Sequence, residues 1–464
     1  MHANPLAPSW LRPPSDANAL VPGVWSMTAR RGAAGGIEIG GIAAETLAAE
    51  YGTPVYVVDE ADVRARAAAT KAAFDRELAR VGSSAKVYYA GKAFLCAEVV
   101  RWVAAAGLGV DVASHGELAV ALAAGLDPSR IGVHGNNKSL AQLDAAVAAG
   151  VGAIVIDAEV EIGRVAEAAR RHDRVQPVRL RINSGVHAST HEYLATAHED
   201  QKFGVTLADA PRVVAAIRAE PSLAFLGLHS HIGSQIFDTD GFAEAARRLL
   251  GLHADLLAGG DIPELNLGGG FGIAYTSADT PRPIEDIAAG IATALAETAA
   301  ALGIPVPTIA VEPGRSIVGP STTTLYRVGT IKPVTVDTPG APATRTYVSV
   351  DGGMSDNLRT SLYRADYAAR IADRTSDADP VLARVAGMHC ESGDIVVRDE
   401  YLPGDIAPGD LLAVPATGAY GWAMSSNYNW VPRPPVIAVR DGQARTIIRG
   451  ETIDDLMARD AALG

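Results

Sequence analysis

The sequence contains only two cysteines, Cys96 and Cys390, among 464 residues. Two cysteines cannot form the dense disulfide framework of small secreted proteins, and so low a count is typical of a reducing compartment. The sequence also lacks any run of about 18 or more apolar residues, which a membrane-spanning helix needs. Residues 1–14 show no charged segment followed by an apolar one, so no signal peptide is expected. These absences predict a cytoplasmic protein.

The chain also lacks an excess of basic residues and any long run of them. Lysine and arginine number 40 against 53 aspartates and glutamates, which gives a formal net charge of −13. A general nucleic-acid-binding protein usually carries a basic patch, so this acidic balance argues against that class. Hydrophobic residues make up 48% and charged residues 20% of the chain, which is ordinary for a globular protein of two or three domains.

Eight short, mainly apolar segments alternate with helix-forming segments in the first two thirds of the chain. They are residues 86–90, 108–112, 131–134, 153–156, 178–182, 225–231, 264–267 and 308–312. Apolar strands separated by helices indicate a parallel sheet that is covered on its outer face. Eight such units favour a closed (β/α)8 barrel. A doubly wound open sheet is the alternative, but it rarely needs eight consecutive units.

After Gly319 the pattern changes to short strands with turn residues between them and few helices. This pattern predicts an antiparallel β domain. We therefore expect an N-terminal arm and strand over residues 1–58, a barrel over 59–320 and the β domain over 321–464. The β domain is also expected to take in N-terminal residues, because the short alternating segment 36–41 precedes the barrel.

Polar residues or glycines follow every predicted barrel strand at its carboxyl end. They include Lys92, Asp111, His134, Asp157, Arg181, Asn183, His229, His231, Gly268, Gly269, Gly270, Glu312 and Arg315. Barrel enzymes place their catalytic residues at this end of the strands. A single histidine or lysine at a strand end is more often an ordinary polar residue than a catalytic one. A set that covers all eight strands predicts an active site.

The types of residue in this set suggest pyridoxal phosphate. The glycine-rich segment 266–272 offers backbone N–H groups that suit a phosphate, although a tight turn explains the glycines about as well. Arg315 adds a charged donor for a phosphate or a substrate carboxylate. Lys92 follows an apolar strand, and an enclosed lysine can form a Schiff base. Glu312 can pair with a pyridinium nitrogen, and His231 can stack on the ring.

Nine motifs, spread in order from about residue 88 to residue 420, carry a resemblance to a known family. They are YYAGKAF (88–94), GVDVASHGEL (109–118), HGNNKS (134–139), GLHSHIGSQIFD (227–238), NLGGGFG (266–272), EPGRSIVG (312–319), DGGMSDNLR (351–359), HCESGD (389–394) and GAY (418–420). With these motifs the chain resembles the diaminopimelate decarboxylases. They belong to a larger group that includes ornithine and arginine decarboxylases and, more distantly, alanine racemase.

The resemblance implies pyridoxal 5'-phosphate as the cofactor and a role for each matching residue. Lys92 would hold the cofactor covalently, His231 would stack on its ring, and Glu312 would pair with the ring nitrogen. The phosphate would be held by Ser234, Gly270, the backbone of Gly314 and Arg315, and Tyr420. No metal is implied.

The resemblance also implies how the substrate is bound. Substrate carboxylates would be bound by Arg315, Arg359 and Tyr363. Cys390 would protonate the carbanion after carbon dioxide leaves, and Glu391 would contact the distal amino group. In the family, the residues matching Cys390 and Glu391 come from the neighbouring subunit, so the resemblance implies a homodimer with shared active sites. The implied reaction converts meso-2,6-diaminopimelate to L-lysine, the last step of lysine biosynthesis.

Three single residues are among the departures from the usual family pattern. His115 stands where glycine is usual, Thr360 follows Arg359 where proline is usual, and Met388 stands where lysine or proline is frequent. Thr360 matters most, because it lies beside a residue expected to bind the substrate. A relaxed or shifted substrate preference is therefore one expectation from the sequence.

Two other functions stay open from the sequence. The first is a decarboxylase of a related basic amino acid, such as D-ornithine, D-lysine, carboxynorspermidine or arginine; ornithine would not need a second carboxylate-binding arginine such as Arg359. The second is a non-catalytic homologue that binds pyridoxal phosphate. Such proteins typically lack the β domain or the cysteine, and this chain contains Cys390 and the segments of a β domain.

Overall fold

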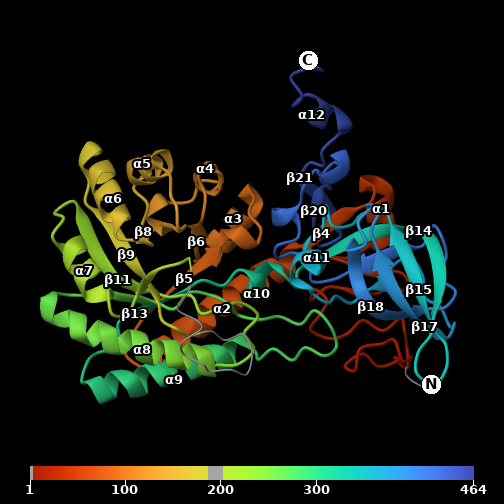
Figure 1. Ribbon diagram of the computed structural model, residues 1–464, viewed down its shortest axis with the longest axis horizontal. Helices are drawn as coiled ribbons and strands as arrows, with labels where there is room; N and C mark the ends of the chain where they lie inside the picture. Colours follow the sequence, from red (N-terminus) through yellow and green to blue (C-terminus); the bar gives the residue numbers. More distant parts are fainter. Residues whose placement is uncertain (1–3, 187–201, 464) are drawn as a thin grey trace. The chain divides into compact units, whose positions relative to one another are not determined.

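The structure, a computed structural model, describes residues 4–186 and 202–463. The chain divides into two compact units (Figure 1). The first, named here the barrel unit, comprises Arg64–Gly272 and Pro281–Ser316. The second, named the β unit, comprises Met1–Val63, Ile273–Thr280 and Ile317–Gly464. The β unit thus contains both N-terminal and C-terminal parts of the chain.

Eight parallel strands form a closed barrel in the barrel unit. They are β5 (Ala85–Ala90), β6 (Gly109–Val112), β7 (Ile131–Val133), β8 (Ala153–Ile156), β9 (Gln176–Asn183), β11 (Leu223–His229), β12 (Glu264–Asn266) and β13 (Thr308–Val311). Each strand pairs with the next, and β13 pairs with β5 to close the barrel. The short β10 (Val205–Thr206) adds to β9. The predicted barrel is confirmed, and the open-sheet alternative is wrong.

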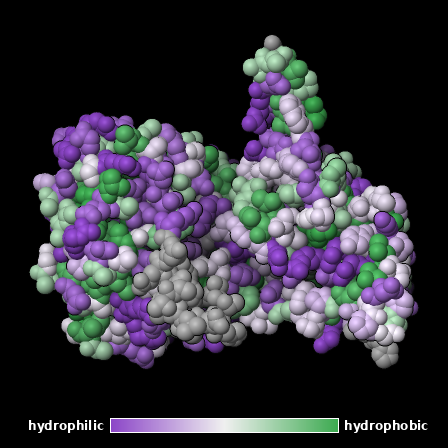
Figure 2. All heavy atoms as spheres, in the orientation of Figure 1, coloured by the Kyte–Doolittle hydropathy of each residue, from purple (hydrophilic) through white to green (hydrophobic). Residues whose placement is uncertain are grey.

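One helix before the first strand and helices between the strands cover the outside of the barrel (Figure 1). They are α2 (Glu60–Arg80), α3 (Ala97–Ala105), α4 (His115–Ala123), α5 (Leu140–Ala149), α6 (Val160–Arg171), α7 (Ala210–Arg218), α8 (Asp240–Leu256) and α9 (Ile284–Leu302). Helix α6 buries Ile162, Val165 and Ala169, a spacing that places them on one face. Figure 2 shows large groups of hydrophilic residues on the visible surface of this unit. No helix of the described residues is long and apolar enough to cross a membrane.

The main sheet of the β unit has nine strands and is largely antiparallel. They are β4 (Val55–Asp59), β14 (Thr322–Val336), β15 (Ala343–Val350), β16 (Arg370–Ile371), β17 (Pro380–Ala386), β18 (Ile395–Pro403), β19 (Leu411–Val414), β20 (Val436–Arg440) and β21 (Gln443–Ile448). Two pairs are parallel, β15 with β17 and β4 with β20. Strand β4 lies between β14 and β20, which confirms that N-terminal residues join this sheet.

The segment around Ile37 does not enter the main sheet. It forms a small sheet of its own from β1 (Arg30–Arg31), β2 (Ile37–Ile39) and β3 (Ile42–Ala43). Gly40 and Gly41, with φ of +59° and +83°, reverse the chain between β2 and β3, and such φ values favour glycine. The remaining α-helices are α1 (Ala44–Tyr51), α10 (Arg315–Val318), α11 (Arg359–Tyr363) and α12 (Ile453–Met457).

An ion-pair cluster lies among the strands of the barrel. Arg179 on β9 is 1% exposed, and its Nη2 donates to Glu264 Oε2 at 2.7 Å and to the Tyr88 hydroxyl at 3.1 Å. Lys86 pairs with the other carboxylate oxygen of Glu264. Burial opposes ionisation of Glu264, but Arg179 and Lys86 outweigh it and hold the pKa of Glu264 below its usual range. A buried cation that loses such a partner destabilises the fold strongly.

We expect Glu264→Gln to lower the free energy of unfolding by about 3–5 kcal/mol, because Arg179 then stays buried without its counter-charge. Urea unfolding at pH 7 measures the loss. The pKa of Glu264 is lower folded than unfolded, so the wild type loses this contribution as the pH falls through the folded pKa. The control is Glu167→Gln on the surface of α6, where an exposed pair with Arg170 contributes less than about 1 kcal/mol. Equal losses in both variants would contradict the prediction.

Candidate active site

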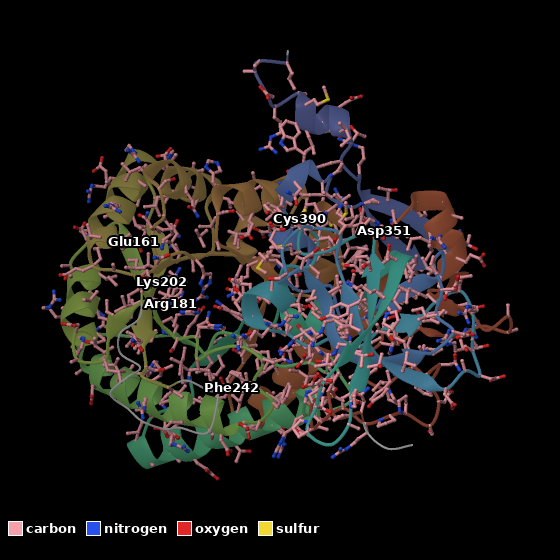
Figure 3. The ribbon with its side chains drawn as sticks, turned by 45° about the vertical axis from the view of Figure 1, so that its right-hand side comes forward. Glu161, Arg181, Lys202, Phe242, Asp351 and Cys390 are labelled. Atoms are coloured by element: carbon pink, nitrogen blue, oxygen red, sulfur yellow. The ribbon has the colours of Figure 1, made fainter. Side chains whose placement is uncertain are left out.

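A cavity of about 320 Å³ lies at the carboxyl ends of the barrel strands. Arg181, labelled in Figure 3, belongs to its wall. The lining residues come from seven barrel segments and are Ala90, Gly91, Lys92, Asp111, Val112, Ala113, His134, Gly135, Arg181, Phe203, His229, His231 and Glu312. The cavity therefore brings together Lys92, His231 and Glu312, which the sequence analysis selected for one site.

Glu312, directly after β13, is the centre of a polar cluster in this cavity. Its Oε1 accepts a hydrogen bond from Asn266 Nδ2 at 2.8 Å. The same oxygen lies 3.1 Å from His229 Nε2 and 3.4 Å from His134 Nε2. Burial opposes ionisation of Glu312, but His229 and His134 outweigh it and hold its pKa well below the usual range. Glu312 is therefore an anion that can face a protonated ring nitrogen.

The three histidines of the cavity are neutral at physiological pH. Burial lowers the pKa of His134 and of His229 to about 4. Burial, followed by the charge of Lys92, lowers the pKa of His231 to about 3. The Gly269 N–H donates to His231 Nδ1 at 3.2 Å, so the ring proton of His231 is on Nε2. A neutral imidazole can stack on a cationic aromatic ring without charge repulsion.

Asp111 at the end of β6 is a buried carboxyl group with room for a ligand. Its Oδ1 lies 3.3 Å from His134 Nε2. Neither of its oxygens has a hydrogen-bond partner within the described part of the chain. Burial, followed by the charge of Glu312, raises its pKa well above the usual value. A protonated Asp111 can donate a hydrogen bond to a molecule in the cavity.

Two glycine segments next to the cavity are suited to a phosphate. Gly270 has φ of +119°, and a Cβ on it would lie 2.5 Å from the Gly233 carbonyl oxygen. A Cβ on Gly314 would lie 3.0 Å from the Ala90 Cβ. Because side chains are excluded there, the backbone of both segments can approach an anion closely.

Arg315 and Ser234 connect these glycine segments with the loop after β11. Arg315 Nη2 donates to Ser234 Oγ at 2.9 Å. The Gly270 carbonyl accepts the Ile236 N–H at 2.9 Å. The four barrel residues expected to bind phosphate (Ser234, Gly270, Gly314 and Arg315) thus come from segments that contact one another.

Lys92 lies in the short helix η1 (Gly91–Ala93), immediately after β5. The Ala90 N–H donates to the Pro313 carbonyl at 3.0 Å, which fixes the start of this helix beside the segment that carries Glu312. The Lys92 side chain lines the cavity, and its charge lowers the pKa of His231. The amine of Lys92 and the carboxylate of Glu312 therefore face the same cavity.

The other expected site residues lie in the β unit. Arg359 at the start of α11 is buried, and its Nη1 donates to the Tyr367 hydroxyl at 2.6 Å. Its guanidinium carbon lies 4.4 Å from the centre of the Tyr275 ring. Tyr363 at the end of the same helix is 61% exposed. Tyr420 has φ of +61° in the loop before the helix η4 (Trp422–Met424). No glycine or motif signal pointed to Tyr275 or Tyr367.

Cys390 and Glu391 lie in an exposed loop between β17 and β18 (Cys390 is labelled in Figure 3). The Tyr428 hydroxyl donates to Glu391 Oε1. Tyr428 was missed by the sequence analysis, because a tyrosine between asparagines carries no catalytic signature. Asp351, also labelled, accepts hydrogen bonds from the Thr53 hydroxyl at 2.5 Å and the Arg327 N–H at 2.8 Å.

The three residues that depart from the family pattern lie in different parts of the structure. Thr360 is buried, and its Oγ1 donates to the Val396 carbonyl at 3.0 Å, which ties α11 to β18. His115 is an exposed residue at the start of α4 and is absent from the cavity lining. Met388 is 54% exposed in the Cys390 loop. The Thr360 hydroxyl therefore has a structural partner within the β unit.

Comparisons with known proteins decide the family. Residues 60–319 match the family model described as "Pyridoxal-dependent decarboxylase, pyridoxal binding domain". The diaminopimelate decarboxylase of Mycobacterium tuberculosis (strain ATCC 25618 / H37Rv) is 52% identical over 447 residues, which cover 95% of this chain and 98% of that protein. The chain belongs to the diaminopimelate decarboxylase family.

Two further members of the diaminopimelate decarboxylase family agree with this assignment. The Bacillus subtilis (strain 168) enzyme is 42% identical over 437 residues, which cover 93% of this chain and 97% of that protein. The crystal structure of the M. jannaschii enzyme in co-complex with L-lysine has a TM-score of 0.86 at 30% identity, and covers 94% of this chain and 98% of that chain. The resemblance drawn from the motifs is confirmed.

We expect Thr360→Val to lower the free energy of unfolding by about 1 kcal/mol, because it removes one buried hydrogen bond at nearly constant volume. Thermal unfolding measures this loss. Substrate preference should not change, since the hydroxyl is already bonded to Val396. Turnover of ornithine by this variant, or a changed KM for diaminopimelate, would contradict this structural role. Ser361→Ala, which removes an exposed hydroxyl on the same helix, is the control.

We expect the stability of the ligand-free protein to fall as the pH is lowered from about 6.5 to about 4. In this window the unfolded chain protonates imidazoles that stay neutral when folded. His229→Asn should reduce the slope of unfolding free energy against pH by up to about 1.4 kcal/mol per pH unit. Urea unfolding across this range measures the slope. His115→Asn, at an exposed position, should leave it unchanged, and equal slopes in all three proteins would refute the prediction.

Proposed function

We propose that this protein decarboxylates meso-2,6-diaminopimelate to L-lysine and carbon dioxide with pyridoxal 5'-phosphate as cofactor, the last step of lysine biosynthesis. The observation that carries the proposal is the cavity at the carboxyl ends of the barrel strands, which both Lys92 and the anionic Glu312 line. The membership of the diaminopimelate decarboxylase family, with relatives 42% and 52% identical, supports the same reaction.

The residues of the cavity fit this cofactor. Lys92 supplies the amine that would hold it. Ser234, Gly270 and the backbone of Gly314 and Arg315 would bind its phosphate, with Tyr420 completing the phosphate pocket. Asp111 supplies a buried carboxyl group whose oxygens have no partner among the described residues. When bound, the cofactor supplies a conjugated ring that takes up the electrons released when the carbon–carbon bond breaks.

Glu312 and His231 would control the ring of the cofactor. The carboxylate of Glu312, kept anionic by its neighbours, would hold a proton on the facing ring nitrogen and so maintain its electron-withdrawing character. His231, neutral and fixed by the Gly269 N–H, would cover one face of the ring. Both side chains are held before any substrate arrives, so little reorganisation is needed during the reaction.

Arg315, Arg359 and Tyr363 would bind the substrate carboxylates. Arg359 is held by the Tyr367 hydroxyl and the face of Tyr275, which keeps its planar guanidinium in one orientation. Glu391 would pair with the distal ammonium group of diaminopimelate. A site built for both charges of the distal end discriminates strongly against substrates that lack them. Ornithine, which has no second carboxylate, would leave one such partner unpaired.

Cys390 would give a proton to the carbon from which carbon dioxide has left. This step needs a site from which water is excluded, but Cys390 and Glu391 are exposed on the β unit. Tyr428 and Trp430, which follow in the neighbouring loop, are 41% and 52% exposed. We propose that a second copy of the chain covers this surface, giving a homodimer with shared active sites.

The cytoplasmic location of the protein stays a prediction from the sequence.

We expect the purified protein to form lysine from meso-diaminopimelate only when pyridoxal phosphate is present, with no turnover of ornithine or arginine. Lysine detection by chromatography measures the product. We expect Lys92→Ala to lose both this activity and the absorbance near the visible edge, because no other described residue of the cavity lining offers an amine. Lys71→Ala is the control, since Lys71 pairs with Asp75 on α2.

Two outcomes would overturn parts of this proposal. Carbon dioxide released from another basic amino acid, without lysine formation from diaminopimelate, would contradict the substrate but leave the fold and cofactor in place. Retained absorbance together with full turnover in Lys92→Ala would contradict the role of Lys92.

A further inference from the structure

His389, the residue before Cys390, is held on three sides within the β unit. Its Nε2 lies 2.8 Å from Ser355 Oγ, and its Nδ1 lies 2.8 Å from Asn429 Oδ1. The centre of its ring lies 5.3 Å from that of Tyr428. Both ring nitrogens and one ring face are thus in contact with other segments. The imidazole has a single orientation, and it fixes the chain at the position next to Cys390.

Tyr428 holds the residue on the other side of Cys390. It begins the short helix η5 (Tyr428–Trp430), and its hydroxyl donates to Glu391 Oε1. Asn429 and Trp430 have φ of +51° and +60°, a region that non-glycine residues adopt only when their surroundings hold them there. This backbone brings the Tyr428 ring and the Asn429 amide to His389 together.

The buried side chain of Asp394 fixes the backbone of the same loop. Its carboxylate accepts the Met354 N–H at 2.6 Å and the His389 N–H at 2.7 Å. Its own N–H donates to the Glu391 carbonyl at 3.0 Å. A Cβ on Gly387 would lie 2.2 Å from this carboxylate, so the chain approaches it closely. Asp394 therefore anchors the backbone at His389 and Glu391, and the side chains of His389 and Tyr428 attach the same stretch to the neighbouring loops.

We propose that His389 and Tyr428 are positioning residues that hold the Cys390 thiol and the Glu391 carboxylate in place for the reaction. This inference rests on the proposed function of Cys390 and Glu391. The two residues act on different properties. His389 fixes the direction of the thiol that gives the proton. Tyr428 occupies one oxygen of Glu391 and leaves the other for the ammonium group of the substrate.

The division of roles predicts different kinetic effects. His389→Ala should lower kcat by about 10- to 100-fold with KM within about 3-fold, because a small displacement of a reacting group has an effect of this size. Tyr428→Phe should raise KM by about 5- to 20-fold with kcat within about 3-fold, because it removes a hydrogen bond to a charged group and keeps the ring. His389→Gln, which keeps one donor and one acceptor, should restore part of kcat.

Alkylation of the thiol by iodoacetamide gives a second readout that needs no turnover. Cys96 is buried, whereas Cys390 is exposed on the single chain and belongs to the proposed active site, so alkylation reports on Cys390. In the holoenzyme, we expect His389→Ala to change the alkylation rate of Cys390 by about 3-fold or more, and Tyr428→Phe to change it by less than about 2-fold. His172→Ala, which removes an imidazole paired with Asp144 in the barrel unit, should leave alkylation and kinetics unchanged.

The outcomes separate this inference from the proposed function. Absence of lysine formation by the wild type would refute the proposed function. The alkylation rates would still test whether His389 positions the Cys390 thiol. Normal lysine formation with unchanged kinetics and alkylation in His389→Ala would overturn the role of His389. A fall in kcat without a rise in KM in Tyr428→Phe would overturn the role of Tyr428. Thermal unfolding shows whether His389→Ala folds. If it does not, the kinetics and the alkylation rate of His389→Gln test the role of His389 instead.

Discussion

The candidate site depends on one interaction, the contact of the Glu312 carboxylate with Asn266, His229 and His134. These residues come from the ends of β13, β12, β11 and β7. The cluster therefore ties four barrel strands together at the end where the cavity lies. The cluster also sets the charge of the cavity, because the Glu312 carboxylate is anionic and the histidines are neutral. A ligand that enters this cavity meets a negative charge already in position.

In the β unit, the residues proposed to bind the substrate and give the proton are held by different contacts. Arg359 is held by two tyrosines, and the loop of Cys390 is held by backbone hydrogen bonds to Asp394 and by contacts of His389 and Tyr428. Loops are otherwise the most mobile parts of a protein. The loop of Cys390 contains no helix or strand, and it is held by the buried Asp394 carboxylate and by the rings of His389 and Tyr428.

The barrel could be predicted from the sequence, because each apolar strand and the helix after it repeat the same local pattern. It also selected Lys92, His231 and Glu312, since polar residues at consecutive strand ends must meet in a closed barrel. It could not find Tyr275, Tyr367 or Tyr428, because their positions depend on contacts between segments far apart in the chain. For the same reason it misplaced the strand near Ile37, whose glycine turn directs it into a separate sheet.

The position of β4 has a consequence for synthesis of the chain. This strand, Val55–Asp59, lies between β14 and β20, and β20 begins only at Val436. At a synthesis rate of about 5–20 residues per second, β4 waits for tens of seconds before its second partner leaves the ribosome. During that time a row of unpaired N–H and C=O groups is exposed, and such an edge can pair with other chains. Keeping nascent chains apart therefore protects this edge until β20 has been made.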